Sequence, residues 1–174
     1  MPKRLSMRAL MLLALCSGIT EAGWSQRESS CTRGKPNALL RMDVYSDFES
    51  SDSRAFYLQT MKSVFADYAD TGKACIIYRD FPQNDHPHAV LAARYAKAAL
   101  QLGARQWSLV AEALFRSQPQ WSKDGGVDQA VAVALTGADM DALRKQLQLS
   151  SVDDAVANDV LSGLAQQVRS TPTI

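Results

Sequence analysis

Cysteine is the residue in this chain best suited to redox chemistry, and it occurs three times, at Cys16, Cys31 and Cys75. Cys31 and Cys75 are 44 positions apart, so they form no Cys-x-x-Cys pair of the kind that activates a thiol. Cys31 lies in a polar stretch with no base or helix dipole, which indicates an exposed thiol without a catalytic role. Cys75 lies in an apolar run and is expected to be a buried apolar side chain. A bridge between these two cysteines cannot be read from the sequence.

The two histidines of the chain, His86 and His88, are two positions apart in the segment H-P-H-A. Imidazole is a common metal ligand, but no Cys, Glu or Asp at ligand spacing completes a site with them on a predicted helix. We therefore expect no metal and no other cofactor. The expected role of both histidines is to pack against or cap the helix that follows.

The stretch from Met42 to Phe56, reading M-D-V-Y-S-D-F-E-S-S-D-S-R-A-F, passes from strand-forming residues through a polar loop into a helical pattern. A loop in this position often forms a reactive or anion-binding site, because the first N–H groups of the helix point into it. A serine there becomes a nucleophile only beside a general base. Because no histidine is adjacent in sequence and no G-x-S-x-G segment occurs, a serine hydrolase is disfavoured.

This stretch resembles the active-site segment S-D-F-x-C-P-x-C-R-x-F of DsbA-like thiol–disulfide oxidoreductases. The matching residues are Ser46, Asp47, Phe48, Arg54 and Phe56. The two cysteines of the family pattern fall on Ser50 and Ser53, and its proline falls on Ser51. The resemblance implies a degenerate site without catalytic residues, because a hydroxyl can neither attack nor store a disulfide. Ser50 or Ser51 and Asp52 are instead good residues with which to begin a helix.

Two further segments resemble the same family. Y-R-D-F-P at residues 78–82, followed by the H-P-x-A that contains both histidines, is one of them. Thr171-Pro172-Thr173 resembles the family's G-T-P-T segment. The resemblance implies that Pro172 is the cis proline, and that Thr171 and Pro172 bind an extended polypeptide substrate through free backbone groups.

The elements expected around these motifs are strands at residues 39–46 and 73–79 and a helix at residues 53–69. The second strand is almost continuously apolar, as is typical of a parallel strand covered on both faces. Apolar steps of three and four residues predict a helical block over residues 88–168, with a loop at residues 118–126 around Pro119. The resemblance implies an α/β protein with a thioredoxin-like fold and an inserted helical domain, with the family's C-terminal hairpin and helix missing.

Composition indicates a single globular domain, because 47% of the 174 residues are hydrophobic and 21% are charged. Residues 1–22 have the basic start and short apolar core of a secretory signal peptide, although a retained N-terminal anchor is an alternative. Residues 23–37 read as a flexible leader, 38–84 as the thioredoxin-like βαβ half, 85–168 as the helical insertion and 169–174 as the cis-proline segment.

Removal of the signal leaves 16 basic and 17 acidic residues. We therefore expect no nucleic-acid partner, no membrane association after signal removal, and a secreted or periplasmic location.

Three functional hypotheses follow from the sequence. The first is an exported, non-redox module that binds extended or unfolded polypeptide near Pro172. The second is a periplasmic thiol–disulfide oxidoreductase that acts through Cys31 or Cys75. The third is a decayed gene product without a function. An open sheet edge beyond Pro172 is also expected to invite self-association.

Overall fold

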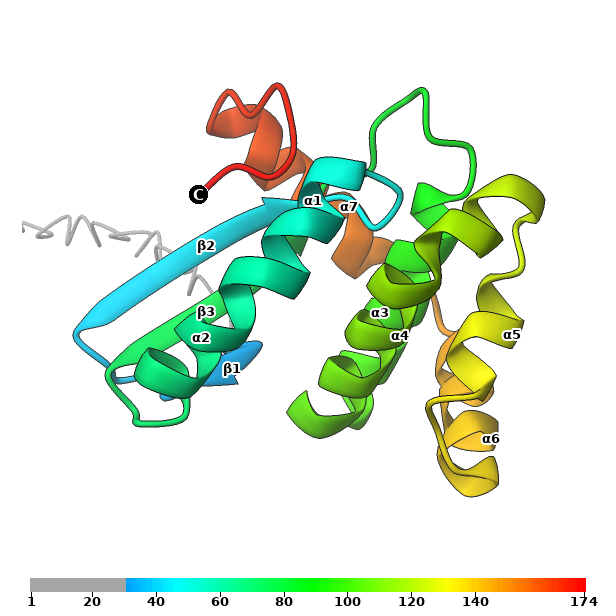
Figure 1. Cartoon of the computed structure of the whole chain (residues 1–174), viewed down its shortest axis with the longest axis horizontal. Helices are drawn as coiled ribbons and strands as arrows, with labels where there is room; N and C mark the ends of the chain where they lie inside the picture. Colours follow the sequence, from blue (N-terminus) through cyan, green and yellow to red (C-terminus); the bar gives the residue numbers. More distant parts are fainter. Residues whose placement is uncertain (1–30) are drawn as a thin grey trace, which may run out of the picture.

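The computed structural model describes residues 31–174 (Figure 1). The predicted signal peptide, Cys16 and the first part of the predicted leader lie outside the described residues. A three-stranded sheet with the strand order β1-β3-β2 is formed by Arg33–Gly34, Leu40–Ser46 and Ala74–Asp80, numbered β1, β2 and β3 along the chain. As predicted, the two expected strands pair in parallel as β2 and β3, from Leu40 opposite Ala74 to Ser46 opposite Asp80.

Residues 31–37 are not the flexible leader that their polar composition predicted. Arg33 and Gly34 pair antiparallel with Ile76 and Cys75. Arg33 also forms two hydrogen bonds of 2.7 Å with the carboxylate of Asp70. Gly34 has a φ of +105°, and a Cβ at this position would collide with the carbonyl oxygen of Ala74. Glycine is therefore the residue that allows β1 to approach β3 this closely.

The helix predicted after the polar loop spans residues 51–69 and lies along one face of the sheet (Figure 1). It consists of four consecutive helical segments, two of them with the wider π-helical turn: α1 (Ser51–Phe56), η1 (Tyr57–Met61), α2 (Lys62–Val64) and η2 (Phe65–Ala69). Ser50 is its N-cap, because the Ser50 side chain accepts a hydrogen bond from the N–H of Ser53. The helix begins two residues earlier than predicted.

The predicted helical block contains five helices. They are α3 (Ala89–Leu102), α4 (Ala104–Asp124), α5 (Val127–Ala132), α6 (Gly137–Gln146) and α7 (Ser150–Ala165). Helices α3 to α6 stand beside the sheet, and the chain then returns through α7 to the end of β2 (Figure 1). None of the helices described here is long and apolar enough to cross a membrane.

Helix α4 continues through residues 118–124, where a loop was predicted because of Pro119. Proline lacks the N–H that would bond to the carbonyl oxygen of Phe115 one turn earlier. In this fold, the Nε–H of Arg54 donates to that oxygen at 2.9 Å. The carbonyl that Pro119 leaves without its helical partner is therefore satisfied by a side chain from α1, and this removes part of the usual cost of proline inside a helix.

A cluster of buried aromatic side chains joins the sheet, the 51–69 helix and the helical block. The ring centroids of Tyr57 and Phe115 are 4.7 Å apart, and those of Tyr78 and Trp107 are 5.0 Å apart. Phe65 packs edge-on against both Tyr57 and Trp107. Because each layer contributes rings to one cluster, the cluster packs the helical block against both the sheet and the 51–69 helix.

Candidate functional site

The polar loop between β2 and α1 carries the two serines at the positions where the family pattern has cysteines. Ser50 Oγ accepts a hydrogen bond from the N–H of Ser53 at 3.2 Å. Ser53 Oγ accepts one from the N–H of Asp47 at 3.4 Å. Ser53 is fully buried, whereas Ser50 is 8% exposed, so Ser50 is the one of these two serines that lies closer to the surface. Both hydroxyls thus help to close the first turn of α1 onto the loop.

The C-terminal segment returns to this loop (Figure 1). The Thr171–Pro172 peptide bond is cis, and Ser50 Oγ donates to the carbonyl oxygen of Thr171 at 3.4 Å. Thr173 forms two backbone hydrogen bonds with Tyr45 of β2. The N–H of Tyr45 donates to the carbonyl of Thr173 at 2.8 Å, and the N–H of Thr173 donates to the carbonyl of Tyr45 at 3.0 Å. The fold therefore brings Ser50, Thr171 and Pro172 together, although 121 positions separate Ser50 from Thr171.

The carboxylate of Asp47 organises the loop from the inside. Its side chain has no exposed surface. It accepts hydrogen bonds from the N–H groups of Glu49 at 2.7 Å and Gln83 at 2.8 Å, and its Oδ2 lies 2.6 Å from Nδ1 of His86. A buried polar group is costly without hydrogen-bond partners, and these three satisfy the carboxylate oxygens. Asp47 thus ties the loop after β2 to the loop after β3.

His86 and His88 are used structurally at this end of the sheet. Partial burial lowers the pKa of His86, but the hydrogen bond and the charge of Asp47 outweigh it, so that the pKa of His86 is raised above 6.5. The N–H of His88 donates to Oε2 of Glu49 at 2.8 Å. Within residues 31–174, no group of three His, Cys, Asp or Glu side chains is placed to hold a metal ion.

Two side chains that support the loop were not predicted from the sequence. Gln118 of α4 is buried, and its Nε2 donates to the carbonyl oxygens of Phe48 at 2.7 Å and Ser50 at 2.9 Å. Arg54, whose contact with Phe115 is described above, was noted only as a match to the family pattern. Because Gln118 lies 68 positions from Ser50, beside a proline that suggested a loop, no local signal pointed to its role.

The remaining polar side chains near the site form a buried ion cluster beneath the end of β3. Lys97 of α3 contacts the carboxylates of both Asp80 and Asp159. Asp159 also accepts hydrogen bonds from the N–H of Asp80 at 2.9 Å and from the side chain of Arg79 at 3.3 Å. Burial raises the pKa of Asp80 to about 7, although the charge of Lys97 acts in the opposite direction. The cluster therefore contains a carboxyl group that titrates near neutral pH.

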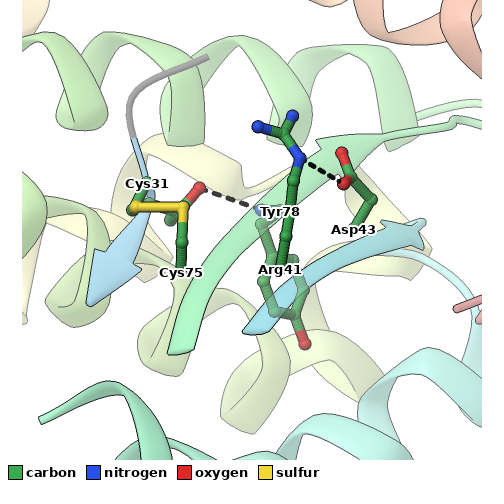
Figure 2. The surroundings of a disulfide bond; sticks show 6 residues. Cys31, Arg41, Asp43, Cys75 and Tyr78 are labelled. Atoms are coloured by element: carbon green, nitrogen blue, oxygen red, sulfur yellow. Dashed lines mark hydrogen bonds and ion pairs between the residues drawn. A yellow bond between two sulfur atoms is a disulfide. The ribbon is translucent and has the colours of Figure 1, made fainter. Parts of the chain in front are cut away.

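Cys31 and Cys75 form a disulfide, which corrects the expectation of two free thiols (Figure 2). Their Cα atoms are 5.2 Å apart, because β1 pairs with the beginning of β3. Asp80, at the other end of β3, lies five positions after Cys75, which is about 16 Å along a strand. The disulfide thus lies at the end of the sheet opposite Ser50, and Cys75 is buried as predicted.

Comparison with known proteins agrees with this geometry. The family model described as thioredoxin matches residues 26–174. The chain belongs to the thioredoxin family. Its fold is thioredoxin-like and of the DsbA type: alpha-DsbA1 from Wolbachia pipientis has a TM-score of 0.67 at 22% identity, with 80% of this chain and 70% of that chain covered.

Two further solved structures show the same fold. BdbD from Bacillus subtilis, in its oxidised form, has a TM-score of 0.67 at 18% identity, with 81% of this chain and 77% of that chain covered. DsbA2 from Pseudomonas aeruginosa has a TM-score of 0.58 at 20% identity, with 80% and 75% covered. No match was found among curated proteins.

Proposed function

We propose that this thioredoxin-family protein is exported and binds extended or unfolded polypeptide beside Ser50, Thr171 and Pro172, without thiol–disulfide exchange at that site. The observation that carries the proposal is the pairing of Ser50 with Thr171. The carbonyl of Thr171 is bonded to Ser50, while the N–H of Thr171 has no hydrogen-bond partner among residues 31–174. An extended chain can bond to such a backbone group without regard to its side-chain sequence.

The absence of exchange chemistry at this site follows from the residues present. Exchange requires a thiolate that attacks one sulfur of a disulfide and releases the other. Ser50 and Ser53 supply hydroxyl groups in place of both sulfurs. Ser50 Oγ is bonded to a carbonyl oxygen and an amide N–H, and neither of these groups can act as the general base that an active serine requires.

Export is supported by two independent features. The N-terminal sequence has the pattern of a signal peptide. The Cys31–Cys75 disulfide is the kind of bond that persists in oxidising compartments such as the periplasm or the extracellular space. A secreted or periplasmic location is therefore part of the proposal.

A second candidate function is thiol–disulfide exchange through Cys31 and Cys75, and the bond between them is the observation in its favour. Its position opposes this role. Cys75 is only 3% exposed, and Cys31 is held beside a strand instead of at the N-terminus of a helix, where a dipole would lower its pKa.

A dithiol-oxidation assay separates the two candidates. We expect the unmodified protein and its Cys31→Ser, Cys75→Ala variant to be equally inactive. Ser50→Cys with Ser53→Cys is expected to gain measurable exchange, because the first thiol would lie at a helix N-terminus. Turnover by the unmodified protein that disappears in the Cys31, Cys75 variant would establish the second function instead.

Binding is tested with a fluorescent, permanently unfolded polypeptide that contains no cysteine. Ser51 is exposed directly beside Ser50, so Ser51→Arg places a large side chain over the site, and Ser51→Ala is its matched control. We expect Ser51→Arg to weaken binding at least tenfold and Ser51→Ala to change it less than twofold. Equal binding by both variants would reject the proposed site.

A further inference from the structure

The exposed side of α4 carries a regular stripe of side chains. The opposite side of α4 is buried, where Trp107 and Phe115 join the aromatic cluster. The members of the stripe follow one another in steps of four, four, three, four and four residues, which keeps them on one face of a helix. They are Arg105, Leu109, Ala113, Arg116, Gln120 and Asp124. Because these steps read the same in both directions, the stripe has a centre of symmetry between residues 114 and 115.

The two ends of the stripe carry opposite charges, and each opposes the helix dipole. Arg105 lies in the first turn of α4, and Asp124 is its last residue. A cation is unfavourable at a helix N-terminus and an anion is unfavourable at a C-terminus. Neither side chain forms an ion pair within residues 31–174, although Asp124 accepts a hydrogen bond from the N–H of Gly126 at 2.9 Å. Within one copy of the chain, both charges therefore lack a counterion.

An apolar pocket lies beside the centre of the stripe, between α4 and α5, which is on the far side of α4 from the sheet (Figure 1). Its volume is about 370 Å³, and its lining includes Leu109, Ala113, Ala130, Val133 and Ala134. Val133 is 86% exposed. Ser117 also lines the pocket, and its hydroxyl already donates to the carbonyl of Ala113 at 2.7 Å. These small side chains leave room for a second helix to approach closely.

A second copy of α4 that lies antiparallel, related by a two-fold axis through the centre of the stripe, complements these charges. Arg105 then faces Asp124 of the second copy at both ends, and each charge comes to the helix end whose dipole favours it. Glu112 accepts from Arg116 of its own copy at 2.7 Å, and lies within one residue of the position opposite Arg116 of the second copy. Val133 lies near the axis, because its pocket is lined by residues on both sides of the centre. In such a symmetric contact it meets Val133 of the second copy.

From these observations we infer that the exposed side of α4, together with Val133 of α5, is a dimerisation surface on which a second copy of this chain docks with its α4 antiparallel. This goes beyond the function proposed above, because none of the side chains involved contacts Ser50 or Thr171. It also places self-association on a helical face, whereas the sequence led us to expect it at a sheet edge. One helix and one exposed valine from each copy make a small interface, as is typical of weak and transient association.

Analytical ultracentrifugation of the protein at concentrations from about 1 μM to 1 mM tests this inference. Val133→Glu brings two carboxylates together at the axis, and Ala132→Glu is the matched control, since Ala132 is exposed on α5 but does not line the pocket. We expect Val133→Glu to raise the dimer dissociation constant at least tenfold, because like charges repel across an interface. Ala132→Glu is expected to change it less than twofold.

Exchange of the two end charges tests the antiparallel arrangement itself. Arg105→Asp and Asp124→Arg each place like charges opposite one another twice in the dimer, so each is expected to weaken dimerisation at least tenfold. The two substitutions combined restore opposite charges and are expected to return the dissociation constant to within threefold of the original value. A defect in the folding of α4 would not be repaired by the second substitution.

Cross-linking provides a measurement that does not depend on a weakened dimer. Val133→Cys is expected to form a disulfide-linked dimer in mild oxidant at least tenfold faster than Ala132→Cys, because the two thiols meet only at position 133. The unmodified protein gives the background from Cys16, since Cys31 and Cys75 are bonded to each other. A protein that sediments as a monomer at every concentration, equal dissociation constants for the two glutamate variants, or no repair by charge exchange would each overturn the inference.

Discussion

Removal of the Cys31–Cys75 disulfide is expected to lower the stability of the protein strongly. The bond closes a loop of 44 residues that contains β1, β2 and the whole 51–69 helix. In the chain-entropy model, opening a loop of this length restores unfolded-state entropy worth about 4 kcal/mol at 25 °C. Because folded domains are stable by only roughly 5–15 kcal/mol, this is a large fraction of the total.

The measurement is urea unfolding of the unmodified protein and of Cys31→Ser with Cys75→Ala, each with and without a thiol reductant. Alanine at position 75 avoids a buried hydroxyl group, since Cys75 is only 3% exposed. We expect the variant to lose about 4 kcal/mol of unfolding free energy. Reductant is expected to cause a similar loss in the unmodified protein and none in the variant.

The contacts that remain around β1 define what would refute this reasoning. Arg33 keeps its two hydrogen bonds to Asp70, and Thr32 still accepts from the N–H of Tyr78 at 2.9 Å. These contacts join residues 37 and 46 positions apart, but they break on unfolding and therefore do not restrict the unfolded chain as a covalent bond does. A loss below about 1 kcal/mol, or no effect of reductant on the unmodified protein, would show that the bond contributes little of the entropy assigned to it.

Two further predictions concern the supports of the site. Gln118→Ala removes both hydrogen bonds from α4 to the site loop and is expected to cost about 2 kcal/mol in urea unfolding, whereas Gln120→Ala, on the exposed side of α4, should cost under about 0.5 kcal/mol. The pKa of Asp80 is raised by burial from 3.8 to about 7, so the folded state binds this proton more tightly than the unfolded state. The contribution of Asp80 to stability is therefore full below pH 3.8 and is lost as the pH rises through about 7; Asp80→Asn should flatten this part of the pH profile in thermal melts.

The parts of the fold that could be predicted are those that depend on neighbouring residues. The strand-forming residues of β2, the apolar run of β3 and the polar loop with Ser50 as a candidate N-cap are visible in short windows of sequence. The disulfide could not be predicted in the same way. It depends on Arg33 and Gly34 reaching the start of β3, and two residues are too short a strand to give a period.

The wrong prediction of a loop around Pro119 also arises from a contact between residues that are far apart in the sequence. Proline is a valid local signal for a helix end, and the sequence rule fails here because Arg54 satisfies the carbonyl that proline leaves free. The same continuation of α4 positions Gln118 against the loop. Because the contact between Arg54 and Phe115 joins residues far apart in the sequence, neither the full length of α4 nor the role of Gln118 could be predicted.

The contacts around the loop after β2 explain how it keeps its shape without the cysteines of the family pattern. The buried carboxylate of Asp47 and the amide of Gln118 hold the loop, and Arg54 joins α1 to α4 beside it; none of these contacts involves a sulfur atom. Ser50 and Ser53 occupy their positions with hydrogen bonds that a thiol forms only weakly. Under the function proposed above, serine at these two positions prevents exchange at this site, while the hydrogen bonds of Ser50 keep the loop against Thr171. For this reason, we expect loss of exchange activity and retention of polypeptide binding to occur together in this protein.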